Sequence, residues 1–273
     1  MSEDFSIAWL ALREPYDATA RSLALMDRLA AWRRGRGASR VLDLGAGTGA
    51  NLRRLAPALG GEQSWTLVEL DPALITVGTK RLVGTGVTWA YCQLDLACDL
   101  ERLEAVRPDL ISASALLDLV AEPWLARLAT LRARTDAAFH IVLTYDGRIA
   151  WDPPDPTDAA VAELVNRHQR TDKGFGPALG PDAVPTLRRL LAGAPGELLV
   201  ECSDWRLGPG DRAIQSALLA GYAAAAASVS PSRAAEVAAW RDRRARLVAE
   251  GASGLTVGHL DLLFLPAAQA SRA

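Results

Sequence analysis

Short apolar runs alternate with amphipathic stretches along the first half of the chain, a pattern typical of an α/β protein with a mostly parallel sheet. The apolar runs predict strands over 41–44, 65–69, 87–92, 109–114 and 137–144. Apolar positions at helical spacing predict an amphipathic helix over 17–34, before the first strand, and further helices between the strands. We therefore expect helices on both faces of the sheet.

The second half of the chain is richer in predicted helix. The pattern predicts helices over 157–168, 182–192, 211–228 and 231–250, and strands over 197–205 and 255–265. A proline-rich stretch over 151–156 predicts a rigid link that cannot be helical. No internal repeat and no linker divides the chain, so we expect one domain with helical insertions.

Composition narrows the class of protein. The chain has 273 residues, of which 50% are hydrophobic and 23% charged, which is enough to bury a full core. A net charge of −2 without a long basic run argues against a nucleic-acid partner. Three cysteines without metal-ligand spacing predict free thiols, no metal site and a reducing compartment. Without an apolar run of signal-peptide or membrane-span length, a cytoplasmic protein with no membrane partner is expected.

A glycine-rich loop follows the first predicted strand. Residues 41–50 read V-L-D-L-G-A-G-T-G-A, an apolar strand that turns through three alternate glycines into a helix. Such a turn lets a ligand lie against bare backbone and against the first amides of the helix. The spacing also satisfies the weak dinucleotide fingerprint. However, Asp43 places a carboxylate where a pyrophosphate would otherwise lie, so a ligand with positive charge is favoured.

The V-L-D-L-G-x-G-x-G run resembles the first motif of the class I, Rossmann-like, S-adenosylmethionine-dependent methyltransferases. The resemblance covers roughly residues 38–145. It implies a Rossmann-like seven-stranded, mostly parallel sheet in a single methyltransferase domain over 1–273. Within it we expect a leading helical segment over 1–37, a cofactor-binding core over 38–145, and helical or lid segments over 146–196 and 207–254.

The resemblance also implies which residues bind S-adenosylmethionine and, after transfer, S-adenosylhomocysteine. Glu69 lies about 20 residues past the loop, where such folds place an acid that accepts the ribose hydroxyls; the other interpretation is a helix-start residue. Asp95 is expected to accept from the adenine amino group, or else to be a turn residue, while Asp99 is expected to cap a helix over 100–106. The expected cofactor-binding residues are Asp43, Gly45, Ala46, Gly47, Gly49, Glu69, Leu70, Asp95, Leu96 and Ser112.

Candidate catalytic residues follow the fourth and fifth predicted strands. Segment 116–120 resembles the family segment beneath the transferring methyl, so Asp118 could orient or deprotonate a substrate; it could equally be a solvated helix-start acid. Tyr145, a candidate catalytic residue, and Asp146, a candidate substrate contact, lie at the carboxyl end of a strand, where ligands bind in open α/β sheets. The chain lacks an Asn/Asp-Pro-Pro-Tyr/Phe run after the fourth strand, which disfavours amino methyltransferases of the adenine, cytosine and glutamine type.

The polar segment 166–177 predicts a substrate lid. Asn166, Arg170 and Lys173 are expected to bind a polar substrate, and His168 could serve as general base because its ordinary pKa lies near neutrality. An ordinary charged loop is the alternative interpretation. The resemblance implies that the leading helix covers the cofactor, so Tyr16 or Arg21 at its start could contact it, and Tyr16 is also a candidate substrate contact; the other interpretation is that both residues anchor the helix. The two remaining histidines are expected to be structural.

The function predicted from the sequence is in-line methyl transfer to a small polar molecule. The alternative is a non-catalytic S-adenosylmethionine-binding subunit of the same fold; a protein or RNA methyltransferase or an NAD-dependent dehydrogenase fits less well. The insertion over 207–254 could form a cap over the site or a homodimer contact.

Overall fold

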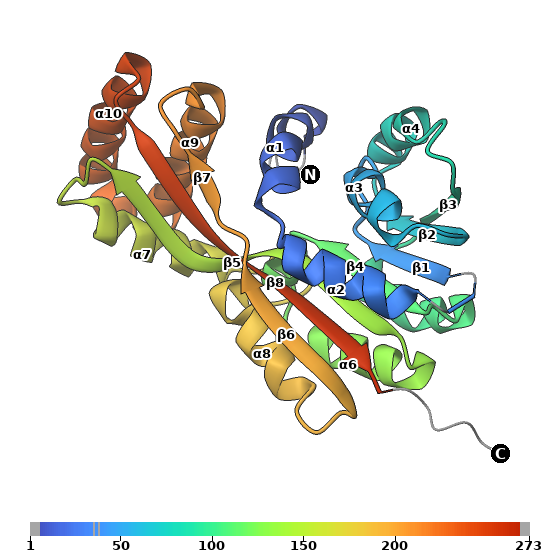
Figure 1. Ribbon diagram of the computed structural model, residues 1–273. Helices are drawn as coiled ribbons and strands as arrows, with labels where there is room; N and C mark the ends of the chain where they lie inside the picture. Colours follow the sequence, from blue (N-terminus) through green and yellow to red (C-terminus); the bar gives the residue numbers. More distant parts are fainter. Residues whose placement is uncertain (1–5, 35, 38, 268–273) are drawn as a thin grey trace.

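The computed structural model describes residues 6–34, 36–37 and 39–267. One sheet of eight strands runs through the described chain in the order β3-β2-β1-β4-β5-β8-β6, with β7 paired to β8 (Figure 1). All pairings among β1 to β5 are parallel, and all pairings of β8 are antiparallel. The mostly parallel α/β sheet predicted from the sequence is confirmed, with one strand more than expected. The strands are β1 (Ser39–Leu44), β2 (Gln63–Glu69), β3 (Thr88–Gln93), β4 (Leu110–Ser114), β5 (Ala138–Asp152), β6 (Gly196–Cys202), β7 (Trp205–Leu207) and β8 (Gly254–Pro266).

Helices cover both faces of this sheet. The α-helices are α1 (Ile7–Ala20), α2 (Leu23–Arg33), α3 (Ala50–Leu59), α4 (Pro72–Arg81), α5 (Leu96–Asp99), α6 (Glu122–Thr135), α7 (Asp158–Gln169), α8 (Ala183–Leu190), α9 (Arg212–Val229) and α10 (Ala234–Glu250). Short 3-10 helices are η2 (Leu100–Val106), η3 (Leu117–Leu119), η4 (Gly180–Asp182) and η5 (Pro231–Arg233). None of the described helices is long and apolar enough to cross a membrane.

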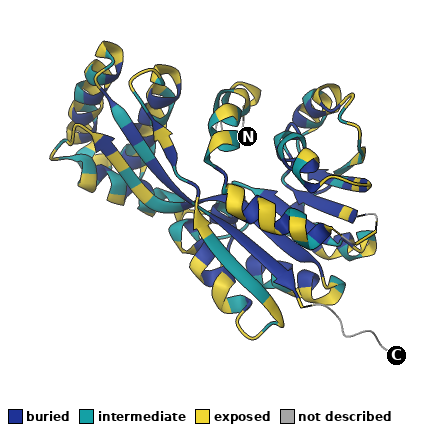
Figure 2. Ribbon diagram, viewed as in Figure 1, coloured by how far each residue is buried: buried dark blue, intermediate teal, exposed yellow. Residues whose placement is uncertain are grey.

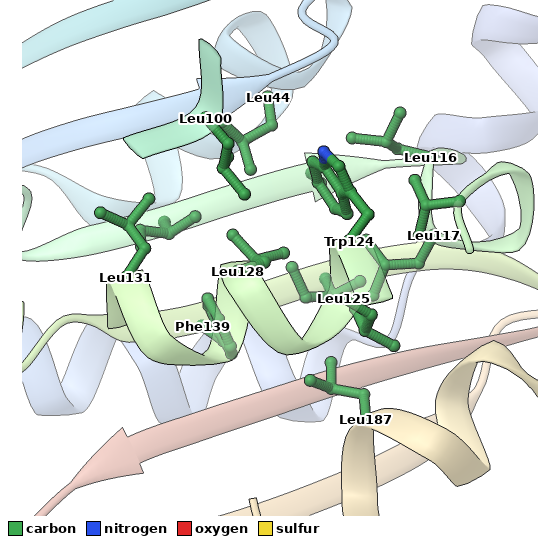
Figure 3. Packing of buried hydrophobic residues seen from close by; sticks show 14 of the residues in the cluster. Leu44, Leu100, Leu116, Leu117, Trp124, Leu125, Leu128, Leu131, Phe139 and Leu187 are labelled. Carbon is green, nitrogen blue, oxygen red and sulfur yellow. The ribbon is translucent and has the colours of Figure 1, made fainter. Parts of the chain in front are cut away.

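Two hydrophobic cores lie on the two faces of the sheet. Apolar residues of α6 and α8 pack on one face, where Leu128 and Leu131 lie near Phe139 of β5 (Figure 3). Residues of α2 and α3 pack on the other face. Side chains alternate along a strand, so Leu42 and Leu44 of β1 enter the first core, whereas Asp43 points toward α3. The carboxylate of Asp43 is thus buried between two apolar residues of β1.

The leading helix is broken, contrary to the prediction of one helix over 17–34. α1 ends at Ala20 and α2 begins at Leu23, with Ser22 accepting a hydrogen bond from the Leu25 amide as its N-cap. The Ser22 amide donates to Asp261 of β8 over 2.9 Å. A bond to a residue distant in sequence therefore fixes the break, which the local pattern does not reveal.

The paired strands β5 and β8 extend past the ends of the neighbouring strands β4 and β6, and a lobe of helices packs on this extension. The prediction that the fifth strand stops at 144 was wrong, since β5 continues to Asp152. Of the link predicted over 151–156, residues 153–156 do connect β5 to α7 without helix or strand. Leu143 forms an irregularity in β5, with a φ of 56°, and its amide donates to Asp261 over 2.8 Å. The extended strands, β7 and helices α7, α9 and α10 enclose a third core. In Figure 1, α1 lies between this lobe and helices α3 and α4.

Candidate functional site

The glycine loop adopts the conformation expected of a ligand loop. Gly45, Gly47 and Gly49 have φ values of 63°, 53° and 77°, in the left-handed region that favours glycine. A Cβ added to Gly49 would lie 2.8 Å from a methyl carbon of Leu82, so this position excludes other residues sterically as well. The backbone is bare between β1 and the first turn of α3.

Glu69, at the end of β2, lies directly against this loop. Its Oε2 accepts from the Gly47 amide over 2.8 Å, and its Oε1 accepts from the amides of Leu70 and Asp71 over 2.8 and 3.0 Å. Leu70 beside it is 55% exposed. The structure therefore brings the predicted acid of the second strand to the second glycine of the loop.

Asp43 lies beneath the loop and is 1% exposed. Its Oδ1 accepts from Asn51 Nδ2 over 2.5 Å, while its Oδ2 has no hydrogen-bond partner. Burial and, to a smaller extent, the charge of Glu69 raise the pKa of Asp43 to about 7, although Asn51 and Arg21 oppose the shift. A cationic ligand would favour the ionised carboxylate, whereas a phosphate would disfavour it.

Asn51 belongs to a buried polar network that the sequence analysis did not identify. Its Nδ2 also donates to Ser112 Oγ over 2.8 Å, and that hydroxyl donates to the His140 carbonyl over 3.1 Å. Arg21 Nη1 donates to Asn51 Oδ1 over 2.6 Å, and its Nη2 to Ser114 Oγ over 3.1 Å. Ser112 is fully buried, so its hydroxyl supports Asn51. The sequence signal for this network was an asparagine at the second position of the helix that follows the glycine loop.

Asp95 follows β3 and is the N-cap of α5, where its Oδ1 accepts from the Ala97 amide over 2.8 Å. The expectation that Asp99 caps the helix over 100–106 was wrong, because Asp99 makes no side-chain cap bond to η2. The carbonyl of Leu96 accepts from Trp124 Nε1 over 2.6 Å. The proposed adenine contact of Asp95 stays a prediction.

A second acidic centre is formed by Asp118 in η3. This side chain is 8% exposed, and its Oδ1 has no partner. Burial raises the pKa of Asp118 to about 6, against the effects of hydrogen bonds from its own amide and that of Tyr145 and of the charges of Arg13 and Lys173. Asp118 is therefore a buried acid, which excludes the alternative of a solvated helix-start residue.

Tyr145 and Asn166 are held to each other beside Asp118. The Tyr145 hydroxyl donates to Asn166 Oδ1 over 2.8 Å, and Asn166 Nδ2 donates to the Gly147 carbonyl over 3.0 Å. Burial raises the pKa of Tyr145. Asp146 forms an ion pair with Arg148. The structure thus joins two predicted site residues, Tyr145 and Asn166, and engages Asp146 in a separate pair.

The turn over 172–177 is held by hydrogen bonds to the side chain of its first residue, Asp172. Asp172 Oδ1 accepts from the amides of Gly174 and Gly176 over 2.7 and 3.0 Å. Lys173 Nζ lies 3.4 Å from His168 Nδ1, so these two candidates lie together. Arg170, in contrast, pairs with Asp182 over 2.9 Å and is 45% exposed. The charge of Lys173 acts on Asp118.

Helix α1 carries one more predicted site residue and a charge that acts on Asp118. Tyr16 donates to Asp211 Oδ1 over 2.9 Å. Arg13 bonds Asp17 over 2.9 Å, and its guanidinium carbon lies 5.1 Å from the ring centre of Trp205. The charge of Arg13 acts on Asp118, but the sequence pattern did not single it out, because α1 was predicted to begin later. The described residues include no group of three or more His, Cys, Asp or Glu side chains that could hold a metal ion.

Comparison with known proteins gives a family match for one segment of the chain. Residues 41–136 match the sequence model of a family described as a methyltransferase domain. No curated protein matches the chain. A solved structure of a Bacillus halodurans protein assigned as a methyltransferase is 13% identical, with a TM-score of 0.50 over 88% of this chain and 98% of that one.

Two further solved structures show similarity at lower TM-scores. The cyclopropane synthase MmaA2 from Mycobacterium tuberculosis is 12% identical, with a TM-score of 0.46 over 96% of this chain and 87% of that one. A methyltransferase from Geobacter sulfurreducens, solved with S-adenosylhomocysteine, is 16% identical, with a TM-score of 0.44 over 92% and 97%.

The family match contains the parts of the site that the sheet brings together. Segment 41–136 includes the glycine loop, Glu69, Asp95 and Asp118. At 13% identity, the similarity to the Bacillus halodurans structure is evidence for the fold alone. Residues 41–136 therefore match a methyltransferase-domain family, and the fold around them is similar to that of a protein assigned as a methyltransferase.

Proposed function

We propose that this protein transfers the methyl group of S-adenosylmethionine to a small polar molecule. The observation that carries the proposal is the buried, unpartnered Oδ2 of Asp43 beneath the glycine loop, with the Glu69 carboxylate beside the same loop. These two carboxylates fit a ligand with a sulfonium and an ammonium group and do not fit a pyrophosphate. The charge of the chain, −2 overall, favours a small substrate over a nucleic acid.

The residues that would hold the cofactor follow from this fit. Asp43 would face its positive charge, and the backbone of Gly45, Ala46, Gly47 and Gly49 would lie against its amino-acid end and ribose. Glu69 would accept the ribose hydroxyls, with Leu70, Asp95 and Leu96 beside the adenine. When bound, the cofactor supplies a methyl group made electrophilic by the sulfonium; the protein aligns the acceptor and excludes water.

Asp118 is better placed than His168 to take a proton from the acceptor. His168 Nδ1 lies 3.4 Å from Lys173 Nζ, so a contact with the lysine already engages one ring nitrogen of His168. Asp118 has an unpartnered oxygen and a pKa raised to about 6, which suits a base near neutral pH.

The substrate would then lie between α1 and the segment 166–177. An acceptor that carries a hydroxyl or amine hydrogen would satisfy Asp118 Oδ1. Lys173 and His168 would bind a polar or anionic part of the same molecule, with Tyr145 and Asn166 fixing that wall. Tyr16, Asp146 and Arg170 would border the entrance.

Calorimetry tests the cofactor half of the proposal. We expect S-adenosylhomocysteine to bind and a nicotinamide dinucleotide not to bind. Asp43→Asn should lower the affinity for S-adenosylhomocysteine by about 10-fold or more. Exposed Asp27→Asn is the control. Absence of a heat of binding with folded protein would remove the proposal. Transfer of labelled methyl from the cofactor to a fraction of small metabolites tests the enzyme half, and transfer to none would favour the non-catalytic subunit.

A further inference from the structure

His259 of β8 lies next to Tyr145, one of the candidate catalytic residues. The strand register pairs His259 with Tyr145 of β5, and the two ring centres are 6.3 Å apart. The ring centre of Trp205 in β7 lies 5.1 Å from that of His259. Residues that oppose each other in an antiparallel ladder present their side chains on the same face of the sheet. His259 is therefore on the face to which Tyr145 contributes.

The ring of His259 is held as one tautomer. Its Nδ1 lies 3.1 Å from the Val257 carbonyl oxygen, and a carbonyl can only accept, so Nδ1 carries the hydrogen. Burial and, to a smaller extent, the charge of Arg13 lower the pKa of His259 to about 3, although the hydrogen bond to Val257 and the charge of Asp204 oppose the shift. The ring is therefore neutral near pH 7, and its Nε2 presents a lone pair.

The Nε2 atom of His259 is accessible to a ligand. The residue is 5% exposed, and Nε2 has no hydrogen-bond partner among the described residues, yet it is not one of the fully enclosed atoms without a partner. His140 is the contrast, because both of its ring nitrogens are enclosed and unpartnered. Of the two histidines predicted to be structural, His259 alone thus presents an acceptor that a bound molecule can reach.

Tyr145 connects this acceptor to Asp118. The Tyr145 amide donates to the Asp118 carboxylate, while the Tyr145 ring lies against that of His259. Asp118 Oδ1 also has no hydrogen-bond partner. A molecule that donates a hydrogen bond to Asp118 therefore has a second unsatisfied acceptor close by, one tyrosine away.

We propose that His259 is a substrate-binding residue, whose Nε2 accepts a hydrogen bond from a second donor group of the molecule that is methylated. The inference rests on the proposed function and narrows its substrate class. The substrate carries two hydrogen-bond donors, each a hydroxyl or an amine, of which one faces Asp118 and the other faces His259. A carboxylate or phosphate would oppose the Nε2 lone pair, so an anionic part of the substrate lies elsewhere. With a pKa of about 3, His259 is too weak a base to take the proton, and its role is binding.

Two substitutions of His259 separate binding from a structural role. His259→Phe keeps a ring but removes the acceptor, whereas His259→Gln retains an amide oxygen that can accept. The probe is the fraction of small metabolites that receives labelled methyl from the cofactor. We expect His259→Phe to raise the apparent KM for that fraction by roughly 10-fold, as for one hydrogen bond left unmade, with kcat within about threefold. His259→Gln should keep the apparent KM within about threefold of the wild type, and both variants should keep the calorimetric affinity for S-adenosylhomocysteine.

Nitrogen NMR of the wild-type protein with labelled histidines tests the same role without a variant. Between about pH 5 and 8 the His259 ring should carry hydrogen on Nδ1 and none on Nε2. Addition of the same metabolite fraction with S-adenosylhomocysteine should shift the Nε2 signal and leave both His140 nitrogens unchanged.

Several outcomes would overturn the inference. These are hydrogen on Nε2, an Nε2 signal that does not move, or an apparent KM of His259→Phe equal to that of the wild type. An equal rise of KM in His259→Phe and His259→Gln, or a loss of affinity for S-adenosylhomocysteine in both, would make His259 a structural residue. If the wild type transfers methyl to no fraction, the proposed function fails instead, and that failure is seen before any variant is compared.

Discussion

Asp43 shows how a single residue can oppose folding and favour binding. Its carboxylate is buried with one oxygen unpartnered, and its pKa is raised to about 7. In the unfolded chain the group ionises near its ordinary value of about 4. Below that value Asp43 is protonated in both the folded and the unfolded chain, so it does not lower the free energy of unfolding. As pH rises toward 7 the unfolded state ionises first, so stability of the unliganded protein is lost over this range.

Asp43→Asn should therefore stabilise the unliganded protein at pH 8 relative to the wild type, and not at pH 4. A pKa raised from about 4 to about 7 corresponds to an upper limit of about 4 kcal/mol in the free energy of unfolding. Urea unfolding at the two pH values measures the difference. Asp27→Asn on the surface should show none. Equal stability of Asp43→Asn and the wild type at pH 8 would contradict the ionised, uncompensated state assigned here.

Asp118 carries the second prediction at this scale. If it takes the proton of the acceptor, methyl transfer rises with pH through an apparent pKa near 6 and then levels. Asp118→Asn should lower kcat by about 100-fold or more and remove that rise, with cofactor affinity unchanged. His168→Ala should keep the rise. The measurement is the rate of methyl transfer between pH 5 and 8. If the rate of Asp118→Asn still rises through a pKa near 6, Asp118 is not the base.

At the scale of elements, α1 is held between the two parts of the molecule. Glu14 accepts from Arg53 of α3 and Arg81 of α4, over 2.5 and 3.3 Å. Both arginines also contact Thr48 of the glycine loop. On the other side, Tyr16 reaches Asp211 before α9. α1 therefore bridges the glycine loop and the helical lobe, although none of its residues is buried (Figure 2).

Glu14→Gln should loosen this bridge. The two ion pairs are partly exposed, so their loss is worth about 1 kcal/mol together. Exchange of the α1 amides should become about fivefold faster, and the affinity for S-adenosylhomocysteine should fall by a similar factor. Glu104→Gln, which breaks the surface pair with Arg134, should do neither. Exchange as slow as in the wild type would show that other contacts hold α1.

The elements that the sequence predicts well are those whose causes are local. The loop with Gly45, Gly47 and Gly49 carries its conformation in its own residues, and the buried strands carry theirs in apolar runs. The break at Ser22 does not, because it depends on Asp261, far along the chain. The continuation of β5 likewise depends on pairing with β8.

The site shows the same division. The positions of Asp43 and Glu69 follow from strand ends that the sequence reveals. Asn51, Arg21 and Arg13 acquire their roles only when α1, α3 and η3 come together. A cap such as Asp95 is also ambiguous from sequence, because Asp99 offers the same local signal and only the helix start decides between them.

For the whole molecule, the important feature is that the sheet and the helical lobe have separate cores. The lobe core is enclosed by α7, α9 and α10 on the extended ends of β5 and β8. Its central polar contact is the ion pair between Arg244, which is fully buried, and Asp158. Trp240 Nε1 also donates to Asp158, over 2.8 Å, and Arg244 Nη1 donates to the Pro153 carbonyl. The proposed cofactor contacts belong to the other part.

Arg244→Met should therefore destabilise the lobe selectively. Removing one partner of a buried pair leaves Asp158 with uncompensated charge and costs about 3–5 kcal/mol. Amides of α7, α9 and α10 should exchange much faster, while those of β1 and β4 stay protected and S-adenosylhomocysteine binds within about threefold of the wild type. Arg241→Met, at an exposed position of α10, is the matched control. Loss of protection in β1 and β4 to the same extent would mean that the two cores unfold as one unit.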